Sequence, residues 1–423
     1  MVKTLLAALL WLATASAHAQ QPAGIETALR MALRLHPVVG GKQAQVDAKQ
    51  HVGEAVRSQR YPSLSALAQR SSGAQAGGGT TPVTLRARQP LWAFGRIDNA
   101  LAYADADAEV ERADLRRVQR ELLQNTALAY AAVLGSQRRL QLAQHNTEAH
   151  QALFDQIQRR ERGQLASRAD VNLAATRLAQ ARAREQRLAG ELEVAQSDLL
   201  AWTQQPVAAG QPVPEALTAL PGAEAVLDMA LGRSAEVALK EQQVERARAA
   251  VAQARTAAMP TVYLQAEHWR DQPGMARDSR VSVVVEAALD GLGGAVRGQS
   301  AAALSQLEAA QQDLLALRND TSRSVRRLLA NRQALQALIA TQAASLQDLA
   351  ALLESYRRQY EAGTKSWLDL LNMQREASEQ HLQQVQADSD WLAQSLQLTA
   401  LIGGLDTLAG TPAAGAATTA ARE

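Results

Sequence analysis

Apolar residues recur about every 3.5 positions along two long stretches of this chain, which is the spacing of a coiled-coil seam. The two stretches, 96–162 and 295–362, contain no proline. At about 1.5 Å of rise per residue, a helix over either stretch is roughly 100 Å long. A glycine follows each stretch, and helices are predicted to run back over 169–203 and 367–402. The apolar positions of the second seam are Leu335, Ile339, Leu346, Leu349, Leu353 and Tyr356.

Two pairs of short segments with β-strand character precede the long helices. In the second segment of each pair, apolar and polar residues alternate, as in a strand with two different faces. A length of nine to eleven residues suits a tilted strand that crosses a bilayer. Trp92 and Trp269 lie at strand ends, where an interfacial aromatic would sit. Two soluble hairpins would give the same pattern. The four strands are predicted at 63–70, 83–92, 261–270 and 280–289, with turn-rich loops at 71–82 and 271–279.

The whole order of elements occurs twice. A helix predicted at 24–60, broken near Pro37, opens the first half, and a helix at 223–258 opens the second. We therefore predict a duplicated protein with repeats at 20–205 and 223–404, a proline-rich linker at 206–222 and a disordered tail at 405–423. A shift of about 198 residues aligns Met31 with Met229, Val46 with Val244, Arg57 with Arg255, Pro62 with Pro260 and Gly95 with Gly293.

The first 19 residues read as a secretory signal peptide. Lys3 gives a positive start, an apolar run covers 5–15, and Ala17-His18-Ala19 is a small-x-small cleavage site. Beyond it, no run of 18 apolar residues could form a membrane-spanning helix. If the mature chain enters a membrane, it must do so as β-strands. Because four strands cannot close on themselves, several copies would then share one barrel.

Composition and charge exclude several other classes. Aromatic residues make up only 3% of the 423 residues, which is too few for a large globular core, and the formal charge of +2 gives no case for nucleic acid. Cysteine is absent, so disulfides, thiol chemistry and a lipidated cysteine are excluded. His145 and His150 are five residues apart on a predicted helix and do not share a face. With no HExxH, GxSxG or phosphate-binding loop, neither a catalytic nor a metal site is expected.

The chain resembles the TolC-like outer-membrane factors. The resemblance rests on the duplicated order, on QPLWAFGR at 89–96 and on the second turn with Gly363 and Asp369-Leu370-Leu371. It implies a mainly α-helical homotrimer with a small 12-stranded membrane β-barrel that continues into a periplasmic helical tunnel. It also implies two partners: a periplasmic adaptor, and an inner-membrane ABC transporter or proton-driven pump. No cofactor is implied. A periplasmic adaptor or a soluble coiled-coil scaffold is the alternative class.

The resemblance also suggests roles for residues at the two helical turns. Acidic residues at the start of the last long helix ring the tunnel entrance in the family; Asp369 matches the first such position, but the second is Asn372 here. Asp170 and Asp369 also suit the first turn of a helix for purely structural reasons. The expected gate residues are Asp170, Tyr360, Lys365, Asp369 and Asn372, and the expected adaptor-docking residues are Gly163, Ser167, Arg168, Gly363, Thr364 and Ser366.

The cargo is the least constrained feature. Many drug-efflux members carry a lipidated cysteine, which this chain lacks. Together with SWLDLLN at 366–372 and QRE at 374–376, this absence favours the branch that serves type I secretion of a large adhesin or toxin. Efflux of drugs or metals is the alternative.

Overall fold

The computed structural model describes residues 23–68, 83–270, 278–288 and 290–410. The expected signal peptide lies outside these ranges, as do most of the two strand-connecting loops. The first half contains helices α2 (Ile25–Leu35) and α3 (Pro37–Ser58), strands β1 (Ser63–Ala68) and β2 (Val83–Trp92), and helices α4 (Arg96–Arg162) and α5 (Arg168–Thr203). The second half contains α6 (Ala223–Arg233), α7 (Ala235–Thr256), β3 (Thr261–Arg270), β4 (Asp278–Glu286), α8 (Gly294–Glu361) and α9 (Trp367–Leu401). Three short elements are the 3-10 helices η1 (Glu215–Leu217) and η2 (Asp290–Gly293) and the helix α10 (Asp406–Ala409).

The two halves therefore have the same order of elements, as expected from the repeated landmarks. The break predicted near Pro37 is present, because α2 ends at Leu35 and α3 begins at Pro37. The single helix expected at 223–258 is wrong. Ser234 interrupts it and caps α7, since its hydroxyl oxygen accepts a hydrogen bond from the Val237 amide at 3.4 Å.

The structure divides into two compact units. One contains residues up to 36, 120–230 and those from 324 onward; the other contains 37–119 and 231–323. In the second unit, equivalent ion pairs join the equivalent helices of each repeat. Lys42 lies 2.5 Å from Asp114 between α3 and α4, and Lys240 lies 3.1 Å from Asp313 between α7 and α8. The duplication therefore extends to individual contacts.

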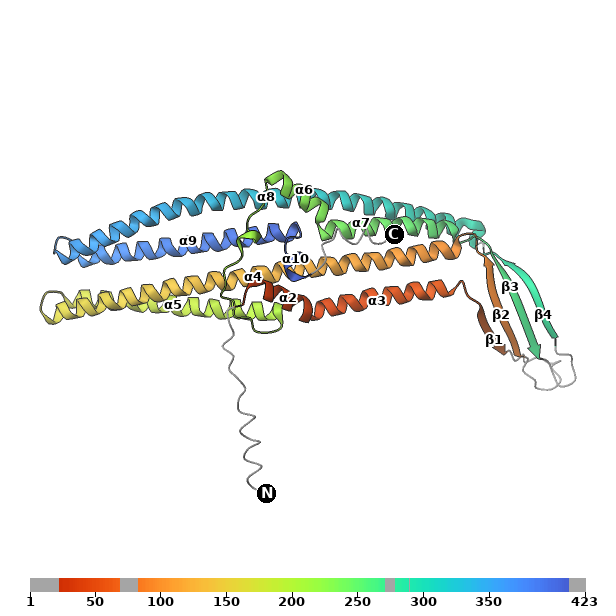
Figure 1. Ribbon diagram of the computed structural model, residues 1–423, viewed down its shortest axis with the longest axis horizontal. Helices are drawn as coiled ribbons and strands as arrows, with labels where there is room; N and C mark the ends of the chain where they lie inside the picture. The colour runs from red at the N-terminus through yellow and green to blue at the C-terminus, as the bar shows by residue number, and fades with distance from the viewer. Residues whose placement is uncertain (1–22, 69–82, 271–277, 289, 411–423) are drawn as a thin grey trace, which may run out of the picture. The chain divides into compact units, whose positions relative to one another are not determined.

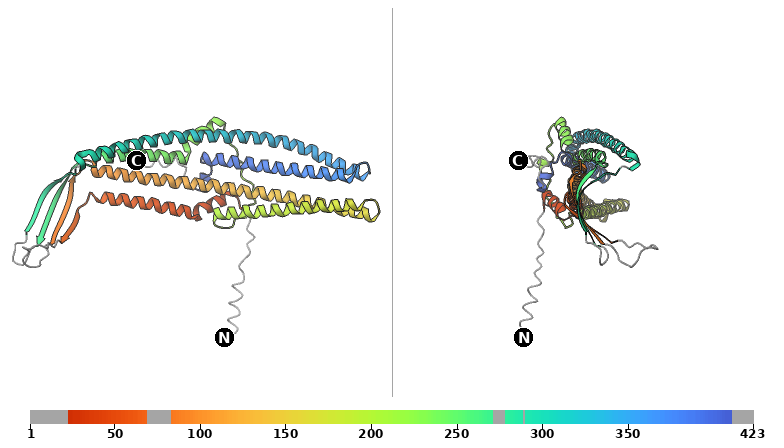
Figure 2. Two further views of the ribbon diagram at one scale, coloured as in Figure 1. Left: turned by 180° about the vertical axis from the view of Figure 1, so that it is seen from behind. Right: turned by 90° about the vertical axis from the view of Figure 1, so that its right-hand side faces the viewer.

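The four strands form one antiparallel sheet in the order β1-β2-β3-β4 (Figures 1 and 2). The register pairs Leu85 with Ala66 on one side and with His268 on the other. A bulge between Pro90 and Trp92 shifts the register at the end of β2. The last strand was expected at 280–289, but β4 begins at Asp278 and ends at Glu286.

The two faces of this sheet differ in chemistry. Residues that lie opposite each other share a face, so Leu64, Leu264 and Val283 lie on the same side as Ala87 and its neighbours. The apolar side chains on this face are exposed, Leu64 to 78% and Val283 to 64%. The other face is polar: Arg86 Nε donates to Glu267 at 2.6 Å, and Arg88 Nε donates to Gln265 at 2.8 Å. The apolar face of the sheet is thus the exposed one, whereas a strand pair that covers a soluble core buries its apolar face.

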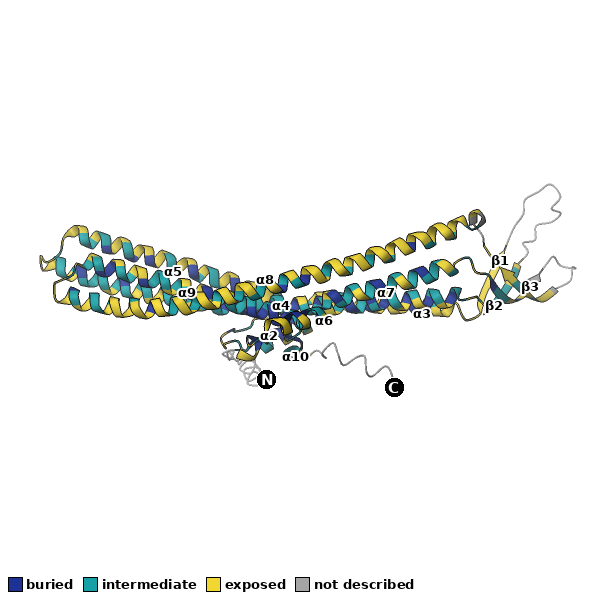
Figure 3. Ribbon diagram, turned by 90° about the horizontal axis from the view of Figure 1, so that it is seen from above, coloured by how far each residue is buried: buried dark blue, intermediate teal, exposed yellow. Residues whose placement is uncertain are grey.

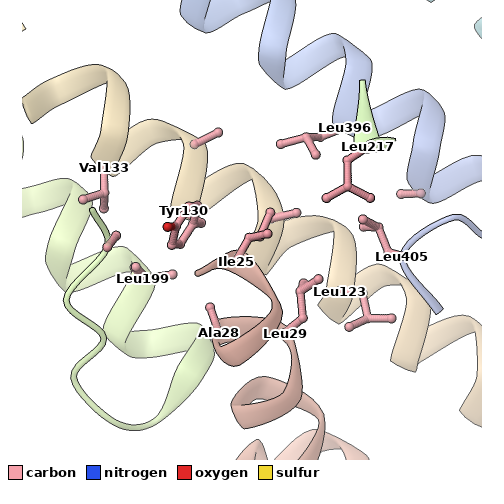
Figure 4. Close-up of a cluster of buried hydrophobic side chains, with 14 of the residues drawn as sticks. Ile25, Ala28, Leu29, Leu123, Tyr130, Val133, Leu199, Leu217, Leu396 and Leu405 are labelled. Carbon is pink, nitrogen blue, oxygen red and sulfur yellow. The ribbon is translucent and has the colours of Figure 1, made fainter. Parts of the chain in front are cut away.

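The first unit has a hydrophobic core where both repeats contribute side chains (Figure 4). The phenol oxygen of Tyr130 lies 2.9 Å from the Ala23 carbonyl oxygen and 2.7 Å from that of Gln211. These contacts hold the start of α2 and the connection between the repeats against α4. The core residues labelled in Figure 4 are Ile25, Ala28, Leu29, Leu123, Tyr130, Val133, Leu199, Leu217, Leu396 and Leu405.

The expected start of the disordered tail at 405 requires correction. Leu405 is 1% exposed, and Asp406 begins the short helix α10. Arg120 donates to the Asp406 carboxylate through Nε at 2.9 Å and Nη2 at 2.6 Å, so a buried ion pair fixes this segment. Residues 411–423 lie outside the described part of the chain.

The predicted seam of α8 agrees with its burial. Leu346 is buried and the other five seam residues are partly buried, whereas most of the residues between them are exposed. Figure 3 shows that exposed residues predominate along α8. Leu315 and Leu352, which lie off this seam, are 52% and 41% exposed. Among the described helices, none is long and apolar enough to cross a membrane.

Candidate functional site

The candidate site is the pair of helical turns at 163–167 and 362–366, which we call the first tip and the second tip. Each tip ends its first helix with the same two-bond C-cap. In the first tip, the Leu165 amide donates to the Arg160 carbonyl and the Gln164 amide donates to that of Glu161, both at 2.8 Å. In the second tip, Thr364 and Gly363 make the equivalent bonds, at 2.9 and 3.1 Å.

The residue with left-handed backbone differs between the tips. It is Gly363 in the second tip, with φ of 75°, but Gln164 in the first, with φ of 60°. We expected Gly163 to make the first turn, yet a Cβ atom added to Gly163 would meet only ordinary contacts, at 3.6 Å and beyond. The structural counterpart of Gly363 is therefore Gln164, which explains why the repeat offset seemed to change by one residue at the glycines.

Both tips restart their second helix with a capping box. The Ser167 hydroxyl accepts from the Asp170 amide at 3.1 Å, and Asp170 accepts from the Ser167 amide at 2.9 Å. Ser366 and Asp369 make the same pair of bonds, at 3.2 and 3.3 Å. The bonds from Ser167 lower the pKa of Asp170, and the bond from the Ser366 hydroxyl lowers that of Asp369. Both aspartates therefore have a local structural role.

The two tips lie side by side at one end of the first unit (Figure 1). Two contacts join one tip to the other. The indole Nε1 of Trp367 donates to Asp170 Oδ1 at 2.9 Å. Arg160 donates to the Tyr360 hydroxyl at 3.0 Å and lies 4.7 Å from the centre of its ring. Tyr360 is only 4% exposed, so this second contact is largely shielded from water. Each contact joins one repeat to the other.

The structure places the expected gate residues as follows. Asp170 and Tyr360 are in the inter-tip contacts, but with Trp367 and Arg160 rather than with each other. Lys365 lies 4.8 Å from the centre of the Tyr356 ring, and Asn372 is exposed on α9. The expected docking residues, namely Gly163, Ser167, Arg168, Gly363, Thr364 and Ser366, are all exposed on the tips.

Sequence reasoning missed Trp367 and Arg160. Trp367 directly follows the capping Ser366 at a position where the first repeat has Arg168. An aromatic residue with a polar atom at a helix start was a signal, because a half-buried indole usually finds an acceptor. Its partner could not be found, since that depends on how two hairpins lie against each other.

One buried histidine lies on α4 before the first tip. His150 is 7% exposed, and burial together with the nearby Arg177 lowers its pKa, which favours its neutral form. In the part of the chain that the structure describes, no three His, Cys, Asp or Glu residues gather to hold a metal ion.

Comparisons with known proteins agree with this architecture. The sequence profile of outer membrane efflux proteins matches residues 28–203 and again 226–404, most of each repeat. The chain belongs to the outer membrane efflux protein family. No curated protein sequence matches it.

Solved structures are similar over nearly the full length. The outer membrane protein VceC of Vibrio cholerae has a TM-score of 0.76 at 17% identity, covering 90% of this chain and 96% of its own. The CmeC outer membrane channel of Campylobacter jejuni has a TM-score of 0.78 at 11% identity, covering 94% and 88%. The open state of the Neisseria gonorrhoeae MtrE outer membrane channel has a TM-score of 0.74 at 17% identity, covering 90% and 88%.

The expected fold class is confirmed: a mainly α-helical, duplicated chain with a small β part, as in TolC-like channels. The protein is an outer-membrane component whose helical part lies in the periplasm. The amphipathic sheet is the part suited to lipid, because its exposed face is apolar.

Proposed function

We propose that three copies of this protein close one 12-stranded barrel in the outer membrane and form the exit duct of a tripartite export system. The observation that carries this proposal is the four-stranded sheet. Its apolar face is exposed, and among the described strands β1 and β4 each pair on one side only. An unpaired edge is unfavourable in lipid, and closure with neighbouring copies satisfies both edges.

The polar face of the sheet then lines the water-filled interior. The ion pairs of Arg86 with Glu267 and of Arg88 with Glu286 keep this wall hydrated but nearly balanced in charge. Trp92, which is 63% exposed, and Trp269 are proposed to sit at the lipid–water interface. Such a wall conducts cargo and has no catalytic role.

The tips are proposed to be the periplasmic gate. Asp369 from each copy would ring the entrance, with Asn372 in place of a second acid. Asp170, Tyr360 and Lys365 would hold the tips closed. The exposed contacts of Asp170 and Lys365 would contribute about 1 kcal/mol or less each, whereas the contact of Tyr360 is shielded from water. An inner-membrane pump and a periplasmic adaptor can open such a gate, because several weak contacts are exchanged for adaptor contacts.

Single-channel conductance tests the gate. Lys365→Ala or Asp369→Ala should raise conductance in a planar bilayer, and unchanged conductance would remove the gating role of these two residues.

A second experiment tests the adaptor docking surface, which is proposed to include Gly163, Arg168, Gly363 and Thr364. A bulky residue at Ser167 or Ser366 should then spare trimer assembly but block export.

The cargo is proposed to be a large protein secreted by a type I pathway, such as an adhesin or a toxin. The support is the second tip with its SWLDLLN sequence and the lack of any cysteine for lipidation. Efflux of drugs or metals is the second candidate, supported by the description of the matching family as efflux proteins.

One comparison tests both parts of the proposal. The culture supernatant of a strain lacking this protein is compared with that of its parent by mass spectrometry. Loss of one large secreted protein supports type I secretion, and an unchanged supernatant with raised sensitivity to drugs or metals supports efflux. If neither changes, and the detergent-extracted protein has the mass of one copy, the export duct itself is excluded.

A further inference from the structure

A small cavity in the first unit is lined by three helices, α4, α5 and α9, which lie next to one another in Figure 1. Its volume is about 190 Å³, below the roughly 300–1,000 Å³ of pockets for drug-sized ligands, so it admits only a small ion or molecule. It lies away from the sheet and from both tips, to which the proposed function assigns roles. The polar side chains that line it are His145 and Asn146 of α4, Arg184 of α5, and Gln374, Ser378 and His381 of α9.

The ionisable side chains of this lining are all basic. Arg184 is partly buried and His381 is exposed, and neither makes an ion pair with any residue that the structure describes. His145 Nδ1 lies 3.4 Å from Glu148 Oε2, which leaves its Nε2 for another partner. Among the described residues that line the cavity, none is an aspartate or a glutamate. The cavity therefore gathers basic groups without a carboxylate to balance them.

The remaining polar groups of the lining supply hydrogen-bond donors. The Ser378 hydroxyl donates to Asn146 Oδ1 at 2.6 Å, which leaves both N–H groups of that amide to donate elsewhere. The guanidinium of Arg184 has five N–H donors and no acceptor. An imidazole donates from both nitrogens when it is protonated, and a bound anion favours that form. The cavity is thus suited to a ligand that accepts hydrogen bonds.

Basic groups continue one helical turn closer to the tips. His150 is one turn from Asn146 on α4, and Arg177 is one turn from Ala181 on α5. Arg177 Nη1 donates to Gln180 at 2.9 Å, but its Nε is buried without a hydrogen-bond partner among the described residues. The positive charge that collects here favours the binding of an anion nearby.

The helical hairpin itself does not require the basic residues of the cavity. The offset of 199 residues that aligns Ser167 with Ser366 places Ala344 and Gln383 at the positions of His145 and Arg184. Both repeats nevertheless form the same pair of long helices. The charges are therefore a property of this cavity and not of the repeated fold.

We infer that the cavity binds a small oxyanion, a phosphate or carboxylate group, through Arg184, His381 and His145, with the Asn146 amide as a further donor. A guanidinium can donate to two oxygens of such a group at once, and the histidines add charge-assisted hydrogen bonds. Because α4 and α5 form the first hairpin and α9 belongs to the second, the bound anion joins the two repeats. A metal cation fits less well, since the charge of Arg184 repels it.

Isothermal titration of the detergent-extracted full-length protein with sodium phosphate tests the inference, with sodium chloride of equal ionic strength as the reference. Saturable binding of phosphate is expected. The double variant Arg184→Gln, His381→Gln should weaken it about tenfold or more, because two charge-assisted hydrogen bonds are lost. The matched control His51→Gln, Arg375→Gln changes the same two residue types outside the cavity and should leave the affinity within about twofold.

Sodium acetate in a parallel titration identifies the group that is bound. Binding of phosphate alone assigns the cavity to phosphate groups, and binding of acetate assigns it to carboxylates as well or instead. If neither anion binds, or if the double variant binds as tightly as wild type, the inference is overturned. Binding of Zn²⁺ without either anion would also overturn it, in favour of a metal site.

Hydrogen exchange tests whether the anion joins the repeats. Bound phosphate should slow exchange about twofold or more at 142–146 and 181–184 in the first hairpin and at 374–382 in the second. Slower exchange in one hairpin only would overturn the bridging role. An equal effect along the whole chain would show only the general stabilisation that phosphate gives to folded proteins, and would overturn the site. None of these measurements uses export or conductance, so they are independent of the proposed function.

Discussion

Gln164 holds a backbone conformation that a glycine holds at the equivalent place in the other repeat. Left-handed backbone costs a residue with a Cβ atom roughly 1 kcal/mol more than it costs glycine. The first tip is therefore slightly strained where the second is relaxed. A glycine is available one position earlier, at Gly163, but the C-cap bonds place the left-handed residue at 164.

We predict that Gln164→Gly stabilises the first tip by about 1 kcal/mol, partly offset by the greater freedom of glycine in the unfolded chain. The reverse change, Gly363→Ala, should destabilise the second tip by about as much, since its φ is 75° and only backbone strain opposes the new methyl group. Hydrogen exchange of the amides at 160–170 and 359–369 measures both effects. Gly163→Ala is the control and should leave exchange within about twofold of wild type.

The Trp367–Asp170 hydrogen bond gives a second prediction. Trp367→Phe keeps a ring but removes the donor, so one inter-tip contact of about 1 kcal/mol is lost and the proposed gate should open more often in a bilayer. Because the pKa of Asp170 is lowered, its contribution is present at neutral pH and is lost only as pH falls below the usual carboxyl range. The bond should thus hold the wild-type gate closed equally at pH 7 and pH 5, and the fraction of time that the channel is open should be the same at both. A rise in opening between these values would contradict the assignment.

Residue-level prediction from the sequence succeeded for contacts made within one turn. Asp170 and Asp369 were expected in the first turn of a helix, where a carboxylate is favourable whatever the rest of the fold does, and both lie there. The inter-tip contacts were not identified, since Arg160 and Tyr360 come from different repeats. Nothing in either segment alone shows which side chain of the other lies beside it.

Element lengths followed closely from where proline and glycine occur. The predicted helix 96–162 matches α4, and the strands 83–92 and 261–270 match β2 and β3. The missed break at Ser234 contains no proline, and its signals were Gly232 two residues earlier and a serine with an acid two residues later. The ordered segment after Leu405 was missed because its stability comes from a distant arginine, Arg120.

Close packing of α4 on α9 gives a third prediction. A Cβ atom on Gly135 would lie 2.5 Å from Ser389 Oγ and 3.2 Å from its Cβ, so Gly135→Ala should destabilise the first unit by about 1–3 kcal/mol. Adding Ser389→Ala should recover part of the loss in a double-mutant cycle. Gly190→Ala is the matched control, because nothing lies within 4 Å of it and helix propensity favours alanine by up to about 1 kcal/mol. Thermal unfolding in detergent measures the change in stability for Gly135→Ala, Ser389→Ala, the double variant and Gly190→Ala.

Asp107 joins three helices of the second unit. It lies 2.7 Å from Lys49 on α3 and 3.2 Å from Arg246 on α7. Burial opposes ionisation of Asp107, but the hydrogen bonds from both partners outweigh it and the pKa is lowered. The ionised carboxylate therefore stabilises the folded state above its unfolded pKa of about 4, and this stabilisation is lost as pH falls through the lower folded value.

Asp107→Asn should accordingly reduce stability at pH 7 by about 1 kcal/mol, a small value because both partners are partly exposed. The difference from wild type should shrink steadily below about pH 4. Urea unfolding of the two proteins at several pH values measures it. A difference that stays constant down to pH 2 would show that the amide disturbs packing rather than charge.

At the scale of the whole molecule, the sequence predicted the duplication, the amphipathic sheet and the family correctly. These features repeat or alternate along the chain, so they are visible without knowledge of contacts. The cargo is not encoded in this way, because the helical wall consists of Ala, Leu, Gln, Arg and Glu at seam and surface positions in both repeats.

The two half-paired edges of the sheet also have a genetic consequence. If three copies must pair β1 of one copy with β4 of the next around a ring, one copy that cannot form this strand pairing disables the other two. Co-expression of wild type with an equal amount of a variant carrying proline in β1 should leave only about one trimer in eight fully wild type, whereas independent channels would retain half. Counting channel insertions in planar bilayers distinguishes the two. The sheet edge thus predicts that assembly-defective alleles of this protein are dominant, while a deletion is recessive.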